Sequence, residues 1–327
     1  MQAVLKEFSD ALSAQAKAAR EFTAEIHAEG SRYRSGTLWR ADIVATSEQS
    51  LPQAESYEVK IAGSAPLRAT LAGRDPGTNV AVLRLDAPAP GKLPAAGDPE
   101  PGALALAFGA DGFGGVAVRL GIVSAVAAEW RSRAGGKVDR RIVLDTTLSH
   151  HEDGGPVLDA EGRLLGISTL GHRESVLAIP AATVERSVEI LLAHGHVDRG
   201  WLGVALQPVA IPEAWHEAAG DANGLMVMST VAGGPAAGAG VLVGDILLKI
   251  DGARASDVRN LAENLGSDSI GRQVELSVLR GGIAVSLRAT IAAAPDVGEH
   301  NLNSAACGRR HDLGHGHGRG RSHHRHG

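Results

Sequence analysis

The seven residues from 150 to 156, His-His-Glu-Asp-Gly-Gly-Pro, gather several groups suited to chemistry. A tight Gly-Gly-Pro turn that opens into a strand presents the preceding side chain at a sharp bend, where a hydrolase can hold its nucleophile. The side chain at this bend is Asp153. A carboxylate is the nucleophile in glycosidases and ATPases, but nothing in this stretch supplies a partner that would help it cleave an amide.

Two other chemistries arise from the same stretch. The hydroxyls of Ser149 and Ser168 lie near in sequence, with His150 and His151 as candidate bases, although neither serine stands at the sharp turn. Residues 150–153 could also be read together as metal ligands. Consecutive residues rarely converge on one ion, so a solvated loop is the simpler interpretation.

The composition is that of a globular protein with short strands and tight turns. The chain has 327 residues, 44% of them hydrophobic, yet only 3% are aromatic and 42 are glycines. This length accommodates two domains with tails. The net charge of -5 argues against a nucleic-acid-binding surface on the body of the protein. The single cysteine, Cys307, cannot form an internal disulfide.

The N-terminal segment, residues 1–30, is predicted to form one amphipathic helix that stops at Gly30. Its apolar residues recur at helical spacing at Val4, Leu5, Phe8 and Leu12. Charged residues interrupt the segment, so it does not resemble a signal peptide, and no stretch of the chain is apolar for long enough to cross a bilayer. As written, the chain is expected to be cytoplasmic, although a start codon further upstream could add an export signal.

Residues 31–197 consist of short apolar runs separated by Gly, Pro and Asp, a pattern typical of an all-β barrel or sandwich. The Asp-Ala-Glu-Gly stretch at 159–162 is a predicted hairpin turn. A helix is predicted to close the region, starting near Pro180, ending at Gly195 and packing one apolar face onto the barrel. That face consists of Val184, Val188, Leu191 and Leu192.

A second domain is predicted over residues 198–295. It contains a helix from Ser256 to Leu265, with Ser256 as the N-cap, and two alternating strands joined by Gly281 and Gly282. From residue 296 to 327 the chain is rich in Gly, Arg and His, and it cannot bury enough apolar surface to become ordered.

From residue 31 to 295 the chain resembles the HtrA/Deg serine proteases, a family that combines a trypsin-like double β-barrel with an α+β PDZ domain. Each matching stretch is weak alone, but their joint order and spacing are specific. The stretches are SGTLW, GRDPGTNVAVLRL, RLGIVSAV, DGGPVLDAEGRLLGIST, LAIPAATVERSVEILLAHGHVDRGWLGV and GGPAAGAGVLVGDILLKIDG. The resemblance implies a mainly β fold, with the protease domain at 31–197 and the PDZ domain at 198–295.

The resemblance also places the catalytic triad, and all three of its positions are substituted. Gln49 stands where the family has its histidine, Asn79 where it has its aspartate, and Asp153 where it has its serine. A glutamine amide cannot act as a general base near neutral pH, and the asparagine carries no charge to stabilise an imidazolium. The Asp153 carboxylate would lie beside backbone N–H groups that should receive an oxyanion. An inactive protease domain is therefore expected.

In the second domain the resemblance implies a peptide-binding module. The Trp-Leu-Gly-Val stretch matches the loop that binds a ligand's C-terminal carboxylate, with Arg199 near enough in sequence to add charge. The opposite wall of the groove would come from the predicted helix. The candidate peptide-binding residues are Trp201, Leu202, Gly203, Val204, Val258 and Leu261; the alternative is that the stretch merely begins a strand.

These features predict a pseudoprotease that binds peptides or unfolded proteins as an adaptor, holdase or regulator in protein quality control. The alternative is an active serine endopeptidase with a displaced nucleophile. The family usually trimerises through its protease domain, often with N-terminal aromatics, and it is often periplasmic. A homotrimer or a mixed oligomer with active relatives is thus possible, with Phe8 and Phe22 in the contact or in intramolecular packing.

The C-terminal tail suggests a second alternative, metal binding. No cofactor is required by the fold, but clustered imidazoles suit Ni²⁺, Zn²⁺ or Cu²⁺. The candidate ligands are His315, His317, His323, His324 and His326. The tail carries five arginines against three acidic residues, which leaves non-specific contact with RNA or anionic lipid open. The other interpretation is a solvated tail without function.

Overall fold

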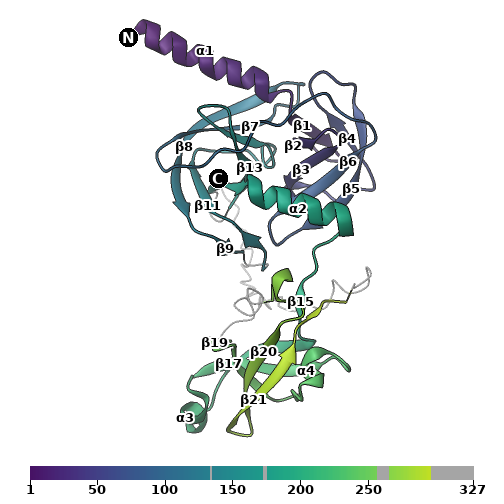
Figure 1. The fold of residues 1–327 in the computed structure, drawn as a ribbon, viewed down its shortest axis with the longest axis vertical. Coiled ribbons are helices and arrows are strands. Elements are labelled where there is room, and N and C mark those ends of the chain that lie inside the picture. Colours follow the sequence, from purple (N-terminus) through teal and green to yellow (C-terminus); the bar gives the residue numbers. More distant parts are fainter. Residues whose placement is uncertain (133–134, 172–174, 256–264, 296–327) are drawn as a thin grey trace, which may run out of the picture. The chain divides into compact units, whose positions relative to one another are not determined.

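A computed structural model describes residues 1–132, 135–171, 175–255 and 265–295 (Figure 1). Most of this part of the chain is strand, arranged as two closed six-stranded barrels and a further sheet. The prediction of a mainly β fold with a trypsin-like double barrel and a PDZ domain is confirmed. No helix among these residues is long and apolar enough to cross a membrane.

The first barrel is closed in the order β1-β2-β3-β6-β5-β4, with antiparallel neighbours throughout. Its strands carry buried apolar side chains at alternating or consecutive positions, as expected where one or both faces are covered. The strands are β1 (Thr23–His27), β2 (Arg34–Arg40), β3 (Ile43–Ser47), β4 (Tyr57–Lys60), β5 (Leu67–Asp75) and β6 (Val80–Leu85).

The second barrel is closed in the order β11-β14-β13-β12-β7-β8. Some of its buried side chains, such as Phe108 and Ile167, pack into the same core as Val44 of the first barrel, while others, such as Val123 and Ile142, form a separate core cluster. The short strands β9 (Trp130–Arg131) and β10 (Lys137–Val138) pair separately. The barrel strands are β7 (Leu104–Ala110), β8 (Val116–Ala127), β11 (Arg141–Asp145), β12 (Pro156–Asp159), β13 (Leu164–Leu170) and β14 (Val176–Pro180).

The N-terminal helix is shorter than predicted. α1 (Gln2–Ala19) ends eleven residues before Gly30, and residues 23–27 form β1 instead. The Thr23 hydroxyl donates to the Ala19 carbonyl at the end of the helix. Beyond it, Ala24 and Ile26 are buried between β2 and β4. Long-range pairing therefore overrides the helical pattern from residue 20 onward.

The predicted helix after the second barrel is confirmed as α2 (Ala181–His194), with Pro180 as its N-cap and Gly195 in the left-handed conformation at its C-cap. Three of its four predicted core residues, Val184, Val188 and Leu191, are fully buried; Leu192 packs against the same core as a partly buried residue. The helix is further fixed to the first barrel because Glu185 accepts hydrogen bonds from Trp39 and Arg40. The hairpin turn at 159–162 is confirmed between β12 and β13.

The PDZ domain is built on a sheet in the order β16-β17-β18-β20-β21, with β19 (Ala253–Arg254) beside β18. The predicted hairpin between β20 and β21 is confirmed, with Gly281 and Gly282 both at positive φ. The main strands are β16 (Val204–Ala210), β17 (Asn223–Thr230), β18 (Ile246–Ile250), β20 (Gln273–Arg280) and β21 (Ile283–Thr290). Smaller elements are β15 (Gly200–Trp201), β22 (Ala292–Ala293), α3 (His216–Ala219), α4 (Pro235–Gly238) and the 3-10 turns η1 (Glu48–Ser50), η3 (Glu213–Trp215) and η4 (Ser267–Ser269).

Candidate functional site

The three substituted triad positions come together between the barrels. Gln49 lies on η1 after β3, Asn79 in the turn between β5 and β6, and Asp153 in the loop before β12. The Gln49 side-chain amide donates to the Asp153 carboxylate at 3.1 Å, and the Gln49 backbone N–H donates to the Asn79 side-chain oxygen at 2.9 Å. The three side chains thus form one hydrogen-bonded set at the junction of the barrels.

Hydrogen bonds between neutral groups hold this arrangement. The Asn79 amide donates to Ser47 at 3.0 Å and to Thr169 at 2.8 Å. The Gln49 amide also reaches Thr169, at 3.0 Å, and the Leu170 carbonyl, at 2.8 Å. Asn79 has a φ of 60°, a left-handed conformation that asparagine tolerates better than most residues. Each amide is therefore engaged in structural bonds.

The Gly-Gly turn beside Asp153 is fixed by close backbone approach. Gly154 has a φ of 99°, and a Cβ there would lie 2.2 Å from the Thr46 hydroxyl of the first barrel. A Cβ on Gly155 would lie 1.8 Å from the Phe108 carbonyl oxygen of the second barrel. No side chain fits at either position, so the glycines hold the loop between the two barrels.

An ion pair that the sequence analysis missed anchors the same loop. Glu152 is buried, and its carboxylate receives two hydrogen bonds from the Arg119 side chain on β8, at 3.0 and 3.1 Å, with a further ion-pair contact at 2.8 Å. The Ser149 backbone N–H donates to Oε2 of the same Glu152 carboxylate, at 2.7 Å. Glu152 raises the pKa of Arg119 through its hydrogen bond and charge. These bonds satisfy a buried carboxylate that would otherwise be costly.

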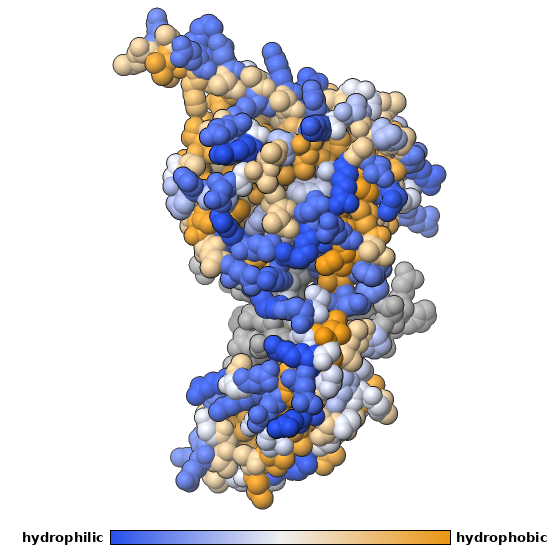
Figure 2. Space-filling view, in the orientation of Figure 1, coloured by the Kyte–Doolittle hydropathy of each residue, from blue (hydrophilic) through white to orange (hydrophobic). Residues whose placement is uncertain are grey.

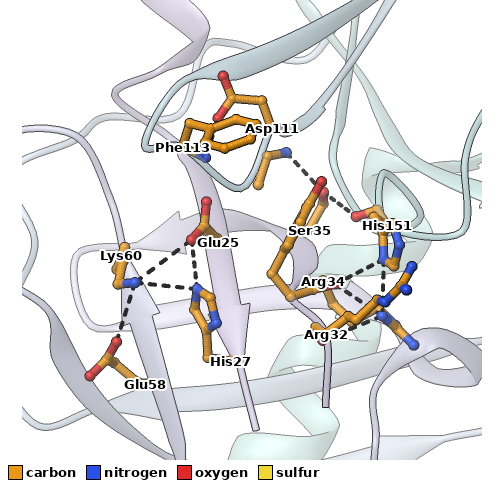
Figure 3. Close-up of polar contacts among 12 residues, drawn as sticks. Glu25, His27, Arg32, Arg34, Ser35, Glu58, Lys60, Asp111, Phe113 and His151 are labelled. Atoms are coloured by element: carbon orange, nitrogen blue, oxygen red, sulfur yellow. Dashed lines mark hydrogen bonds and ion pairs between the residues drawn. The ribbon is translucent and has the colours of Figure 1, made fainter.

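The two histidines of the loop differ in their surroundings. The His151 ring lies against the Tyr33 ring, with 4.9 Å between centroids, and its Nδ1 is 3.1 Å from an Arg34 nitrogen (Figure 3). His150 is exposed. The four residues 150–153 thus point to different partners, and within the described ranges no cluster of metal-binding side chains is found.

Asp153 is the unusual group of the site. It is 2% exposed and lines a cavity of about 410 Å³ together with Gln49, Arg34 and His150. Burial raises the pKa of the Asp153 carboxyl, and the hydrogen bond from Gln49 opposes this rise. Its second oxygen, Oδ1, is buried with no hydrogen-bond partner in the described part of the chain. An unsatisfied buried acceptor makes this position energetically unfavourable.

The candidate displaced nucleophiles are poorly placed. Ser168 is fully buried, and its hydroxyl donates to the Glu152 carbonyl at 3.1 Å. Ser149 is partly exposed, but its neighbouring histidines are engaged or turned to solvent. The backbone N–H groups of His151 and Asp153 have no acceptor among the described residues. Donors suited to an oxyanion therefore remain while the groups that would generate one are missing.

The predicted carboxylate-binding loop precedes β16, the edge strand of the PDZ sheet. Gly203 has a φ of 74°, and a Cβ there would lie 3.1 Å from the Trp201 ring. Leu202 and Gly203 are buried, yet their backbone N–H groups donate to no acceptor in the residues that the structure describes. Buried N–H groups are normally paired, so a ligand oxygen is a suitable partner. The other two candidates, Val258 and Leu261, lie outside the described residues, as does the helix predicted from Ser256.

A second polar cluster lies on the first barrel and was not found from the sequence. Glu25 on β1 is buried, and its carboxylate is 2.6 Å from His27 Nε2 and 3.8 Å from Lys60 Nζ (Figure 3). Lys60 also contacts Glu58 at 3.5 Å. The cluster joins the paired strands β1 and β4. Its residues His27 and Lys60 are 33 positions apart in the sequence. The sequence analysis assigned residue 25 to the N-terminal helix, so it did not anticipate the strand pairing that brings Glu25 and Lys60 together.

Replacing Asp153 by asparagine should stabilise the protein at neutral pH. The pKa of Asp153 is raised in the folded state. At pH values between its pKa in the unfolded state and its pKa in the folded state, the folded protein therefore binds more protons than the unfolded protein. The free energy of unfolding therefore falls as pH rises through that window. We expect Asp153→Asn to raise this free energy by about 1 kcal/mol at pH 7.5, with a smaller gain at pH 4.

Denaturant unfolding of both proteins at the two pH values measures this effect. Asp159→Asn is the matched control, because Asp159 is also buried but accepts bonds from Glu161, Arg163 and the Arg163 side chain. The control should be destabilised. A loss of stability in Asp153→Asn at pH 7.5 would contradict the view that this carboxylate is under-satisfied.

Replacing Arg119 should lower the free energy of unfolding, because the buried Glu152 carboxylate loses its cationic partner. We expect Arg119→Met to lower the free energy of unfolding by about 2–4 kcal/mol, since it leaves an uncompensated buried carboxylate. The double variant Arg119→Met, Glu152→Gln should recover at least half of the loss. Equal losses in the single and double variants would show that the arginine acts through packing alone.

Comparison with known proteins agrees with this architecture. A trypsin-like peptidase domain family matches residues 34–167, and a PDZ domain family matches residues 200–291. A protein named probable periplasmic serine endoprotease DegP-like, from Brucella suis, is 33% identical over 264 residues, which is 77% of this chain and 51% of that protein. A protein of the same name from Bartonella henselae is 32% identical, with the same coverage of both chains. The chain therefore spans about half the length of the curated relatives it matches.

Solved structures extend the similarity to the fold. The HtrA-type protease AlgW with a decapeptide superposes with a TM-score of 0.63 at 26% identity, covering 86% of this chain and 98% of that chain. The serine endoprotease from Yersinia pestis gives a TM-score of 0.63 at 25% identity, covering 86% and 98%. With the two domain matches, the motifs and the double barrel followed by a PDZ sheet, the chain belongs to the HtrA/Deg family.

Proposed function

We propose that this protein is an HtrA/Deg pseudoprotease that binds peptide C-termini or unfolded segments and does not hydrolyse them. The observation that carries the proposal is the hydrogen-bonded set of Gln49, Asn79 and Asp153 at the positions of base, orienting acid and nucleophile. The role that follows is that of an adaptor, holdase or regulator in protein quality control.

Hydrolysis requires a group that removes a proton from a nucleophile at the moment of attack. The Gln49 amide nitrogen has no basic lone pair, and here it donates to Asp153, Thr169 and Leu170. The Asp153 carboxyl has no adjacent base. Whether ionised or protonated, it occupies the place where a substrate carbonyl would have to become anionic. Losing both nucleophile and base of a triad costs about 10⁶ in kcat.

Peptide binding is supported by the edge of the PDZ sheet. β16 pairs with β17 on one side, and no strand lies on its other side among the described residues. An extended peptide can add there as a further strand, while the free N–H groups of Leu202 and Gly203 receive its carboxylate. These contacts use backbone groups, which the substitutions in the protease domain leave untouched.

Self-association is a further part of the proposal. The apolar side chains Val4, Leu5 and Phe8 on α1 are 66%, 63% and 42% exposed, and apolar surface is visible near the N-terminal end of the chain in Figure 2. A homotrimer or a mixed oligomer with active relatives would cover them. Phe22, in contrast, is buried in the first barrel, which assigns it to intramolecular packing. The metal-binding alternative concerns His315, His317, His323, His324 and His326, which lie outside the described residues, and it stays a prediction.

The natural protein should not react with a fluorophosphonate, because Asp153 and Gln49 stand at the positions of the nucleophilic serine and its base. Intact-mass measurement after treatment should show no adduct. A variant carrying Gln49→His, Asn79→Asp and Asp153→Ser should gain one adduct at position 153, since the three positions already lie within hydrogen-bond reach. An adduct on the natural protein at Ser149 or Ser168 would instead support the alternative of an endopeptidase with a displaced nucleophile.

The PDZ domain should discriminate a free carboxylate from an amide. As a probe we would use the tightest heptapeptide selected by the full-length protein from a random library with free C-termini. We expect its C-terminally amidated form to bind about 10- to 100-fold more weakly, because hydrogen bonds to a charged group usually contribute a binding free energy of that size.

A pair of glycine variants makes this test specific. Gly203→Ala and Gly220→Ala both place a side chain at positive φ, but Gly220 has no atom near its added Cβ. Both should lose stability from the strained backbone, Gly203→Ala somewhat more because its Cβ would lie 3.1 Å from the Trp201 ring, and Gly203→Ala alone should lose peptide affinity. Equal binding of acid and amide peptides would rule out the carboxylate loop.

A further inference from the structure

We propose that a cavity on the first barrel, between β1, β4 and the loop that joins β7 to β8, binds a free α-amino acid with an apolar side chain. None of the three triad positions and no residue of the PDZ sheet lines this cavity, so the proposal does not rest on the proposed peptide binding. It follows from a half-paired buried carboxylate, from the charges around it and from the size of the space.

The carboxylate is that of Glu25, which is 5% exposed. Glu25 lies directly opposite Lys60 in the pairing of β1 with β4, so the two side chains share one face of the sheet. Oε1 of Glu25 is 2.6 Å from His27 Nε2 and 3.8 Å from Lys60 Nζ. Oε2 has no hydrogen-bond partner in the described part of the chain. A buried charged oxygen without a donor is costly, and a ligand ammonium would supply that donor.

The space beside Glu25 has a volume of about 350 Å³, and Lys60 and Gly114 also line it. In Figure 3 the free oxygen of Glu25 lies on the side of the loop that carries Phe113. The terminal torsion of a glutamate is soft, so a small rotation of the carboxylate presents Oε2 to the cavity. The volume is at the lower end of the range for ligand sites, which suits a small metabolite and not a peptide of several residues.

A cation without an acidic partner lines the same cavity. Arg20 is the C-cap residue of α1, and its guanidinium donates to the Gly114 carbonyl at 3.2 Å. Within the described ranges no carboxylate forms an ion pair with Arg20. Its other N–H groups therefore remain for a ligand, and the planar guanidinium is well suited to a carboxylate, which it can bind through two parallel hydrogen bonds.

These charges favour a ligand that carries both signs. A simple amine would meet two cations, Arg20 and Lys60, around a single carboxylate. A simple carboxylic acid would be repelled by Glu25. An α-amino acid presents its ammonium to Glu25 and its carboxylate to Arg20, while Lys60 stays in contact with Glu25 and with Glu58, at 3.5 Å from the latter. The charges of ligand and site are then matched.

The rest of the lining indicates the kind of side chain. The cavity is also lined by apolar residues of the turn after β4 and of the start of β8, among them Ile61, Pro66 and Val116. A charged or strongly polar ligand side chain would lose its hydration there without gaining a partner. An aliphatic side chain such as that of leucine would bury its surface instead.

Calorimetric titration of the full-length protein with L-leucine tests the proposal, at concentrations up to about 10 mM because a ligand of this size binds weakly. We expect saturable binding. N-acetyl-L-leucine, which lacks the ammonium, and L-leucinamide, which lacks the carboxylate, should each bind at least about 10-fold more weakly. No binding of L-leucine, or equal binding of either blocked form, would overturn the proposal. These measurements use the natural protein, so they stand even if a variant fails to fold.

Four variants locate the ligand. Glu25→Gln and Arg20→Gln should each weaken L-leucine binding at least about 10-fold. The matched controls are Glu58→Gln and Arg84→Gln, because Glu58 also contacts Lys60 and Arg84 is an exposed cation of the same barrel, yet neither lines the cavity. Both controls should bind L-leucine within about twofold of the natural protein. Unchanged binding in Glu25→Gln, or an equal loss in Glu58→Gln, would overturn the assignment to this cavity.

The proposed carboxylate loop of the PDZ domain offers a second place for L-leucine, and Gly203→Ala separates the two. This variant should bind L-leucine as the natural protein does. Binding that persists in Glu25→Gln and with N-acetyl-L-leucine, but is lost in Gly203→Ala, would assign the ligand to the PDZ loop and overturn the cavity. Failure of the PDZ domain to bind any peptide would contradict the proposed function and leave the expected L-leucine binding as it is.

Discussion

The close contact of the Gly154–Gly155 turn with both barrels is the constraint on which the rest of the protease domain depends. Thr46 and Phe108 approach these glycines so closely that no Cβ can be accommodated. The backbone of the turn is therefore fixed. The residue before it, Asp153, is held at the junction of the barrels by this backbone packing and not by its own side chain. A loop shaped for a nucleophile can persist after the nucleophile is lost, because the shape comes from backbone packing.

The surrounding side chains have adapted to that fixed loop. The buried Glu152 and the partly exposed Arg119 form an ion pair that anchors it to β8, and the amides of Gln49 and Asn79 share the Thr169 hydroxyl. Such a network stabilises a single arrangement only when nearly all its members are satisfied. The buried oxygen of Asp153 is the exception, so the network does not depend on this carboxylate for its geometry.

Elements set by local sequence patterns could be predicted from the sequence, whereas elements set by pairing between distant strands could not. The helix after the second barrel, the turn at 159–162 and the hairpin at Gly281 follow from periodicity and glycine, and each was placed correctly. The N-terminal helix was predicted correctly, but its expected end at Gly30 was wrong because residues 23–27 pair as β1 with β2 and β4. The Glu152–Arg119 pair joins residues 33 apart and has no local signal. The positions of Gln49, Asn79 and Asp153 could be anticipated only because motif order, rather than spacing alone, identified them.

The two sites of this protein differ in what they require. The chemistry of a triad depends on three side chains, and here the three corresponding positions are joined by hydrogen bonds beside two closed barrels. Binding at the PDZ edge depends on backbone N–H and C=O groups, which exist as long as β16 lies at the end of its sheet. Substitution can therefore remove the first activity while the fold preserves the second. The proposed binding site would therefore be sensitive chiefly to residues that set the backbone conformation, such as Gly203, which has a positive φ in the loop before β16.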